Sequence, residues 1–486
     1  MVNKEEKLIF ERSKKGRTGV EPPCSDVGDA IPEEIIPKGF LRSDIVGFPE
    51  VSELDVVRHF TTLSEANFGV DSGFYPLGSC TMKYNPRINE DLARLSGFAA
   101  LHPYVPEEFA QGALELIYDL EAYLKEITGM AAVTLQPAAG AQGELAGMLI
   151  ASAYFRDKGE HRSKVIIPDT AHGTNPATAN LAGFKVVNLK SGKKGILEAR
   201  DVAKVVDTDT AAIMITNPNT LGLFEKNIRE IAEVVHSKGA LLFCDGANMN
   251  ALMGIMKLGD MGVDMVQLNL HKTFSTPHGG GGPGAGPLGV KENLIPYLPA
   301  PRIKKNNEVY SFEEKNTKSI GRLKAFYGNF SIMLRAYAYI QAMGGFGLRK
   351  VSESAILSAN YIKERLKETY HLPFNVRCMH ECVLTDKFQK KYGATTLDIA
   401  KRLIDYGFHP PTIYFPLVVD GAMMIEPTET ESLEVIDSFI SAMEKIAREA
   451  SEAAELLKNA PSTTKTSRVD ETLAARVPKL RWRPKG

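Results

Sequence analysis

Long apolar runs are missing from this sequence of 486 residues. No stretch reaches the roughly 18 consecutive apolar residues that a membrane-spanning helix requires, and the first residues lack the apolar run of a secretory signal. We therefore expect a soluble protein that does not act in a membrane.

An excess of charge of either sign is also missing, because 58 basic and 59 acidic residues leave a formal net charge of −1. No long-range field would draw the whole molecule to nucleic acid or to an anionic membrane surface. We expect a small or locally charged partner, and no nucleic acid.

Cysteine is sparse, and the five residues present are an odd number at irregular spacing. This pattern is not typical of a disulfide framework and predicts a reducing cytoplasm. In the segment CMHEC, two thiols, Cys378 and Cys382, flank His380, but a fourth ligand is not evident and C-x3-C is not the usual zinc spacing. We therefore predict no metal.

Composition divides the chain into four predicted parts: an N-terminal arm (1–63), a large domain (64–325), a smaller C-terminal α+β domain (326–458) and a basic tail (459–486). The tail holds the only tryptophan, Trp482. It is either solvated or docks this ring on a partner subunit, since burying an aromatic ring contributes roughly 2 to 3 kcal/mol.

The large domain alternates short runs rich in valine and isoleucine with stretches of helical period. This order is typical of a mainly parallel sheet with crossover helices on both faces. The predicted strands are Ala131–Gln136, Lys164–Pro168, Lys185–Leu189, Ala211–Thr216, Ala240–Asp245, Met265–Leu270 and Pro287–Lys291. The predicted helices are Gln142–Phe155, Glu198–Val206 and Ile228–Lys238, then Ser331–Ala342, Leu348–Thr369 and Ser432–Lys458 in the small domain.

Lys272 is the strongest candidate for chemistry. It follows His271 at the end of a predicted strand and precedes a glycine-rich stretch, in NLHKTFSTPHGGGGPGAG. A lysine at a buried strand end is costly unless it loses its charge, and a Schiff base with an aldehyde cofactor achieves this. An ordinary lysine at the start of a flexible loop is the alternative.

Asp245 ends the neighbouring predicted strand, in ALLFCDGANMN, at the carboxyl edge where open α/β sheets bind ligands. A carboxylate there would be paired by a protonated pyridine nitrogen and would keep such a ring electron-withdrawing. Taken alone, Asp245 could equally cap a helix. Because one crossover separates its strand from that of Lys272, we expect both side chains over the same edge.

Three further turns follow predicted strands at this edge. In VIIPDTAHGTNPA, His172 could stack on a flat ring or could only cap a turn. In LQPAAGAQGE, the backbone N–H groups of Gly140, Ala141 and Gln142 could cradle a phosphate at a helix start. In ITNPNTLGLFE, Asn219 and Thr220 could meet a phenolic oxygen of the ring, or could form only a turn.

These motifs together resemble the fold type I pyridoxal-phosphate enzymes, the aspartate-aminotransferase superfamily, over about Ser64 to Leu457. The resemblance implies that His172 stacks on the ring and Asp245 meets the pyridine nitrogen. It also implies that Ala247, Asn248 and His271 contact the cofactor and that Lys272 carries it. One position departs from the desulfurase-like branch, which commonly has a phosphate-binding serine where this chain has Asn269.

More narrowly, FYPLGSCTMKYNP, AHGTNPA, TNPNTLGLFE, CDGANMN and the lysine motif resemble the pyridoxal-binding half of glycine decarboxylase, the P-protein family of the glycine cleavage system. The resemblance implies decarboxylation of glycine and transfer of the aminomethyl group to the lipoyl arm of the H-protein. It also implies a partner subunit 1, with two copies of each subunit. Ser79, Cys80 and Thr81 are expected at the glycine or lipoyl entrance, with simple packing as the alternative.

Two other functions stay open from the sequence. A cysteine desulfurase or an aldolase on the same fold would share Lys272 and Asp245, and a non-catalytic scaffold would keep the fold only to assemble a complex. The sequence also leaves open which arginine meets a carboxylate; the candidates are Arg302, Arg322, Arg335 and Arg377.

Overall fold

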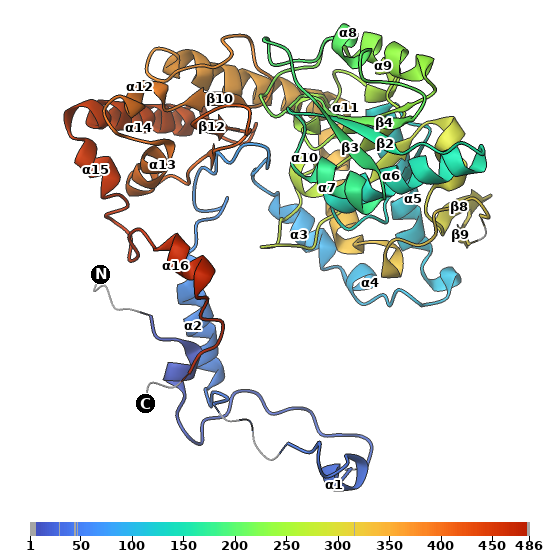
Figure 1. Cartoon of the computed structure of the whole chain (residues 1–486). Helices are drawn as coiled ribbons and strands as arrows, with labels where there is room; N and C mark the ends of the chain where they lie inside the picture. Colours follow the sequence, from blue (N-terminus) through green and yellow to red (C-terminus); the bar gives the residue numbers. More distant parts are fainter. Residues whose placement is uncertain (1–5, 29, 43–44, 46, 315, 484–486) are drawn as a thin grey trace. The chain divides into compact units, whose positions relative to one another are not determined.

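The structure is a computed structural model that describes residues 6–28, 30–42, 45, 47–314 and 316–483 (Figure 1). The chain forms two compact units. One, here called the arm unit, comprises Met1–Ser72 with Pro461–Gly486, and the other, the main unit, comprises Gly73–Ala460. None of the helices within the described ranges is long and apolar enough to cross a membrane.

A seven-stranded sheet organises the main unit (Figure 1). Its strands follow the order β1-β7-β6-β5-β4-β2-β3, in which β7 runs antiparallel to both neighbours and the other pairs are parallel. The strands are β1 Ala132–Thr134, β2 Lys164–Pro168, β3 Lys185–Leu189, β4 Thr210–Thr216, β5 Leu241–Asp245, β6 Met265–Gln267 and β7 Leu288–Val290. All seven predicted strands are therefore present, and the predicted mainly parallel sheet is confirmed.

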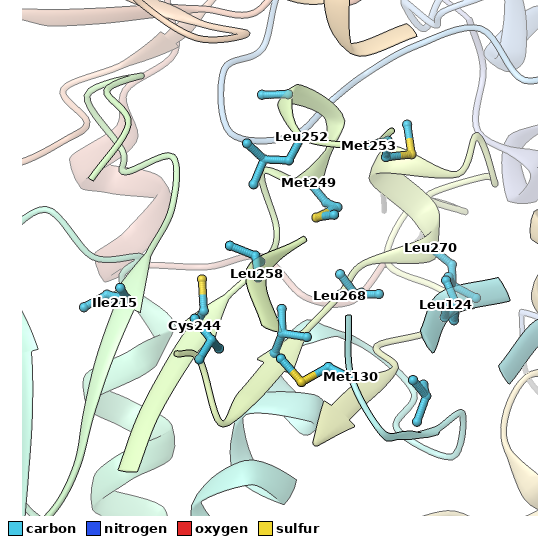
Figure 2. Close-up of a cluster of buried hydrophobic side chains, with 14 of the residues drawn as sticks. Leu124, Met130, Ile215, Cys244, Met249, Leu252, Met253, Leu258, Leu268 and Leu270 are labelled. Atoms are coloured by element: carbon cyan, nitrogen blue, oxygen red, sulfur yellow. The ribbon is translucent and has the colours of Figure 1, made fainter. Parts of the chain in front are cut away.

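Alternate side chains of the strands enter two separate apolar clusters, one on each face of the sheet. Ile213 and Cys244 belong to the first cluster with residues of α5 Gln111–Thr128, α9 Ile228–Ser237 and α11. Met214 and Phe243 belong to the second with residues of α6 Gly140–Asp157 and α7 Thr174–Leu181. Figure 2 shows part of the first cluster, to which Met249, Leu252 and Leu258 belong together with Ile215 of β4 and Cys244 of β5. This alternation produces three layers, helix, sheet and helix.

The second half of the main unit is a smaller α+β domain. Helix α11 Phe330–Leu366 leads into it and contains Gly344, whose φ of 58° interrupts the helix between the two predicted segments. A three-stranded antiparallel sheet follows, in the order β10 Cys382–Thr385, β12 Ala422–Ile425 and β11 Thr412–Ile413. Its helices are α12 Lys387–Lys390, α13 Thr396–Asp405, α14 Leu433–Glu452 and α15 Ala454–Lys458.

Shorter elements complete the main unit. They are α3 Arg87–Ala93, α4 Ser96–Ala99, α8 Ala199–Val202, α10 Leu270–Thr273 and the hairpin β8 Arg302–Asn306 with β9 Val309–Glu313. Two predictions from periodicity extended too far. The strand expected to reach Leu270 ends at Gln267, so Lys272 lies on the one-turn helix α10 rather than at a strand end, and α8 covers only part of the helix expected there.

The segment from Gly73 to Arg87, which is rich in turn formers yet carries apolar side chains, docks onto the small sheet. Leu77 forms an antiparallel bridge with Ile425 of β12, and the Gly78 N–H donates to the Met424 carbonyl over 3.2 Å. This docking brings residues 79–81 to the small domain while keeping them within the main unit.

The arm unit contains α1 Pro32–Ile35, α2 Glu53–Glu65 and α16 Glu471–Arg476. The Ser52 hydroxyl caps α2 by accepting from the Asp55 N–H. The ring of Trp482 stacks on Phe10 with the centroids 4.9 Å apart. The tail that was expected to be solvated or to dock on a partner subunit thus contacts the arm of its own chain.

Candidate active site

The carboxyl ends of three adjacent strands create the site. Asp245 ends β5 and lies level with Thr216 of β4 and Gln267 of β6. Five residues beyond Gln267, Lys272 sits on α10 at the same edge. The expectation that one sheet edge brings Asp245 and the lysine segment together follows from the parallel pairing of β5 with β6.

Lys272 is buried, with 8% of its surface exposed. Its Nζ donates to the carbonyl oxygen of Ser79 over 2.8 Å, the one hydrogen bond of this amine among the described residues. Burial lowers the pKa values of His172 and His271, and the positive charge of Lys272 lowers them further. The same charge opposes the rise in the pKa of Glu426 that burial causes. A buried amine held by a backbone carbonyl is accessible to an aldehyde as soon as it loses a proton.

Asp245 is almost fully buried and is held by two donors. The Ala247 N–H donates to Oδ1 over 2.9 Å, and the Asn175 side-chain amide donates to Oδ2 over 3.2 Å. These contacts fix the carboxylate at the strand end while leaving lone pairs for a further donor. Ala247 therefore contributes its backbone, and its side chain has no polar role.

A second carboxyl group, Glu144 of α6, lies beside Asp245. Ligand atoms of Glu144, His172 and Asp245 all lie within 4.8 Å of one another. Burial and the charge of Asp245 raise the pKa of Glu144 to about 6, and burial lowers the pKa of His172. Thr174 links the two, since its hydroxyl donates to Glu144 over 2.6 Å and lies 3.0 Å from His172 Nδ1. The two carboxyl groups, Glu144 and Asp245, together with the His172 ring could hold a flat ring that carries a positive charge.

The proposed phosphate cradle lies where α6 begins, at Gly140, without a side-chain cap. The backbone N–H groups of its first turn, from Gly140 to Gln142, have no acceptor within the helix. A Cβ at Gly140 would lie 2.4 Å from Asn269 Oδ1, so only glycine admits the close approach of the 269 side chain. Asn269 thus stands at the cradle, where its amide can offer a donor.

Many buried polar side-chain atoms around this edge have no hydrogen-bond partner among the described residues. They belong to Ser79, Asn175, Asn248, Gln267, His271, Thr273, Ser275, Thr276 and His278. Because buried polar groups are nearly always paired, so many orphans at one edge fit a polar ligand with several oxygen and nitrogen atoms. Pyridoxal phosphate is such a ligand, and the residues present fit it.

Two residues expected to meet the ring are used by the chain itself. Asn219 donates to the Gly195 carbonyl and to Glu225, and its Oδ1 accepts two backbone N–H groups. Thr220 donates to the Thr170 carbonyl over 2.9 Å. Both side chains shape the turn after β4, which corresponds to the alternative that the sequence left open.

Of the remaining residues expected to contact the cofactor, Asn248 is partly paired within the chain and His271 packs against another histidine. Asn248 donates to the Pro218 carbonyl over 2.9 Å and keeps Oδ1 unpaired. His271 packs against His278 with ring centroids 5.3 Å apart, and burial lowers its pKa to about 4. Neutral imidazoles near Lys272 add no positive charge to the site.

Sequence reasoning missed several polar and charged residues of the site. Glu144 ends the glycine-turn motif and Asn175 lies inside the histidine motif, so a search for every polar residue in those strings would have found both. The same search would have found Lys83 in FYPLGSCTMKYNP and Glu381 in CMHEC. Lys83 donates to Glu429 over 2.7 Å and to Asn250 over 2.9 Å. Glu426 lies outside every quoted motif and carries no local signal of this kind.

Three of the four candidate arginines are already paired with carboxylates. Arg302 pairs with Glu121, Arg322 with Glu314 and Arg335 with Glu90. In CMHEC the thiols and the histidine separate as well. Cys378 and Cys382 join the apolar cluster of the small domain, while His380 lies with Glu381 and Glu426.

Comparisons with known proteins identify the family of this chain. The family described as "Glycine cleavage system P-protein" matches residues 24–307, and "Glycine dehydrogenase, C-terminal domain" matches residues 351–466. The chain belongs to the glycine cleavage system P-protein family. Membership of this family confirms the fold type I enzyme and the pyridoxal-phosphate cofactor expected from the motifs.

Relatives match over the whole length. "Probable glycine dehydrogenase (decarboxylating) subunit 2" of Bacillus cytotoxicus is 56% identical over 483 residues, covering 99% of this chain and 98% of the relative. The protein of the same name from Listeria welshimeri is 58% identical over 476 residues, covering 98% of each. The chain is thus similar to both relatives over nearly its whole length.

Solved structures support the fold. A crystal structure of glycine decarboxylase (P-protein) in inhibitor-bound form aligns with TM-score 0.72 at 21% identity, covering 85% of this chain and 93% of the other. The apo cysteine desulfurase from Thermococcus onnurineus aligns with TM-score 0.60 at 16% identity, covering 78% and 95%. At these identities the likeness concerns the fold alone.

Proposed function

We propose that this chain is the pyridoxal-phosphate subunit of a glycine dehydrogenase (decarboxylating), subunit 2 of a two-subunit enzyme. The observation that carries the proposal is the buried Lys272, which lies at the same sheet edge as Asp245 and close enough to His172 for its charge to lower the pKa of that ring. The names of the full-length relatives support the reaction and the partner subunit 1.

Each residue of the chain would have a defined task when the cofactor is bound. Lys272 would hold the aldehyde carbon, Asp245 would accept from the pyridine nitrogen, and the first turn of α6 at Gly140 would donate to the phosphate. His172 would cover the ring face. The cofactor supplies the electron sink that glycine decarboxylation requires.

Burial of these groups keeps bulk water away from the reacting carbon. The aminomethyl group would then be transferred to a disulfide of a lipoyl carrier, the H-protein, rather than protonated by solvent. The contact of the Ser79 carbonyl with Lys272 Nζ supports a position for Ser79, Cys80 and Thr81 at the approach to the lysine. We place the glycine or lipoyl entrance there.

A cysteine desulfurase is the alternative function that the geometry of the site argues for or against. It would need a mobile, ionised thiol, and Cys80 is the cysteine nearest the lysine. Burial raises the pKa of Cys80, and the residues on either side are anchored, Ser79 to Glu381 and Thr81 to Glu426. A fixed, protonated thiol is a poor sulfur carrier, so glycine is the better substrate.

The first experiment adds pyridoxal phosphate to the purified chain, reduces with borohydride and locates the modified peptide by mass spectrometry. Lys272→Ala should lose the label completely. Lys363→Ala is the matched control, since Lys363 is also buried and its Nζ also donates to a carbonyl, that of Val376. A label that persists in Lys272→Ala would contradict the cofactor site.

Glycine decarboxylation is tested next with subunit 1 and a lipoyl carrier present. We expect release of CO2 from glycine that Lys272→Ala abolishes and Cys80→Ser leaves intact. Cysteine-dependent sulfide release that is lost in Cys80→Ser would favour the desulfurase, and a chain that is needed for assembly but never labelled at Lys272 would favour the scaffold.

The partner stoichiometry and the compartment belong to the same proposal. We propose two copies of each subunit, as the family resemblance implies, in the cytoplasm. All five cysteines are free, which supports a reducing compartment.

A further inference from the structure

A buried acidic cluster faces Lys272 from the small domain. Glu381 immediately precedes β10, and Glu426 immediately follows β12. Both are fully buried, and ligand atoms of Glu381, Glu426 and His380 lie within 4.8 Å of one another. Two carboxylates in such a space cannot both keep a full negative charge without a large cost.

Both carboxyl groups hold the loop that touches the lysine. The Ser79 N–H donates to Glu381 Oε2 over 2.7 Å. The Thr81 N–H and hydroxyl donate to Glu426 over 2.9 Å and 2.6 Å. Ser79 in turn accepts from Lys272 Nζ through its carbonyl over 2.8 Å. Ser79 therefore links Glu381 to the Lys272 amine. Thr81, which binds Glu426, lies two residues further along the same loop.

The loop adopts a backbone that needs such anchors. Ser79 has φ of 63° and Thr81 has φ of 49°, values in the left-handed region that residues with a Cβ seldom adopt. Conformations of this kind cost of order 1–3 kcal/mol each and persist where surrounding contacts impose them. The hydrogen bonds to Glu381 and Glu426 are those contacts.

Three polar atoms of the cluster are unsatisfied, and none of its three side chains is a lysine or an arginine. Glu381 Oε1 and both nitrogens of His380 lack a hydrogen-bond partner among the described residues. Burial lowers the pKa of His380 to about 3, so its ring is neutral at physiological pH. A proton on one carboxyl group, directed at the other, gives Glu381 Oε1 a partner and removes one negative charge.

The direction of the carboxyl pKa values agrees with this arrangement. Burial raises the pKa of Glu426 to about 7, and burial together with the neighbouring Glu426 raises that of Glu381 further. The other titratable groups that face the pair are Cys80, Lys272, His380, Cys378, Cys382 and Glu429. Of these, Glu429 is neutralised by its ion pair with Lys83, which leaves Lys272 as the cation.

We propose that Glu381 and Glu426 form a carboxyl pair with one shared proton, whose single negative charge and whose anchoring of the 79–81 loop hold Lys272 in its reactive position. They are positioning residues that the small domain contributes to a lysine of the large domain. The inference rests on the proposed function of Lys272. Its consequence is that the pair favours the protonated form of the Lys272-linked cofactor nitrogen, the form that exchanges readily with an incoming amine.

Single and double substitutions distinguish a shared proton from two separate charges. In Glu381→Gln or Glu426→Gln, the remaining carboxyl group loses its like-charged neighbour and ionises, so one negative charge stays. Only the double variant removes it. The readout is a pH titration of the visible absorbance of the bound cofactor, which reports protonation of the Lys272 nitrogen.

We expect the midpoint to change little in each single variant and to fall by about one pH unit or more, roughly tenfold in the protonation constant, in the double variant. Asp386→Asn is the matched control, because Asp386 is also buried, also accepts a backbone N–H, that of Thr396, and immediately follows β10 at the other end. It should leave the midpoint unchanged.

A stepwise fall in both single variants would overturn the shared proton, and an unchanged midpoint in the double variant would overturn the role of the pair. If Lys272 takes no label at all, the proposed function fails instead. A second measurement tests the shared proton without bound cofactor, and it can be made even if the double variant does not fold. Infrared spectra of the wild-type chain near neutral pH should contain a buried carboxylic acid carbonyl band that both single variants lose, and absence of that band overturns the inference.

Discussion

At the scale of single residues, the burial of charge determines which groups the site can contain. Lys272 is buried opposite acidic groups, Asp245 is held by two donors, and Glu144 is buried beside Asp245. An isolated buried charge costs several kcal/mol, so each of these groups needs a partner or a proton. The protonation of Glu144 should therefore respond to pH and to substitution of its neighbours.

Glu144→Gln should alter the pH dependence of stability of the cofactor-free protein. Burial and Asp245 raise the pKa of Glu144 from 4.5 to about 6, so the folded state binds a proton that the unfolded state releases. Stability then falls as pH rises through this window, by up to about 2 kcal/mol. The variant cannot titrate, and its unfolding temperature should fall less between pH 4.5 and 6. Equal slopes in both proteins, with the exposed Glu233→Gln as control, would contradict this.

Gly140→Ala should weaken binding of pyridoxal phosphate. The new Cβ would lie 2.4 Å from Asn269 Oδ1 and 2.9 Å from Gln267 Nε2, which forces the cradle to shift at a cost of about 1–3 kcal/mol. Titration of cofactor absorbance should show an affinity loss of roughly 5- to 150-fold. Gly112→Ala, in the first turn of α5 with nothing within 4 Å of the new Cβ, is the control. Equal affinity in all three proteins would count against the cradle.

At the scale of elements, strand ends decide which residues meet. The valine- and isoleucine-rich runs predicted all seven strands of the large sheet. Burial on both faces imposes a continuous apolar pattern on inner strands such as β4 and β5, whereas the edge strand β3 is mostly exposed or half-buried. Helix α10, which carries Lys272, escaped prediction since a single turn has no periodicity. The acidic pair escaped too, because β10 and β12 are four-residue strands whose flanking glutamates lie 45 positions apart, a separation that follows from 426 minus 381.

Thr395→Ala should destabilise the small domain. Thr395 caps α13 by accepting from the Asp398 N–H, and Asp398 reciprocates at the N-cap N–H, so the loss is about 1 kcal/mol. Thermal unfolding followed by circular dichroism should show a lower midpoint. Ser451→Ala, which removes an exposed hydroxyl that bonds only within α14, should leave it unchanged. The same midpoint in both variants would show that the cap contributes nothing.

At the scale of the whole molecule, the arm unit combines segments from near both ends of the chain. Trp482 in the tail stacks on Phe10 in the arm, and a Cβ at Gly47 would lie 3.5 Å from the same indole ring. The division of the chain into four sequence regions stays a prediction.

Phe10→Ala should change the fluorescence of the single tryptophan. Loss of the stacked ring exposes the Trp482 indole to water, so its emission maximum should shift to longer wavelength. Phe346→Ala, a residue 77% exposed in the main unit, is the control and should have no effect. Identical emission in the two variants would mean that arm and tail do not meet in solution.

The sequence by itself determined the layered fold and the order of the strands along the chain, because these depend on local apolar patterns. It also determined the motifs that place Asp245 at a strand end and Lys272, His172 and Gly140 in the segments that follow strands, because these depend on turn residues. Only the tertiary structure decided which strands are neighbours and which distant residues face the lysine. Glu144, Glu381 and Glu426 approach the site through packing of separate elements. The charge that surrounds Lys272 thus depends on contacts between distant parts of the chain, which no local pattern encodes.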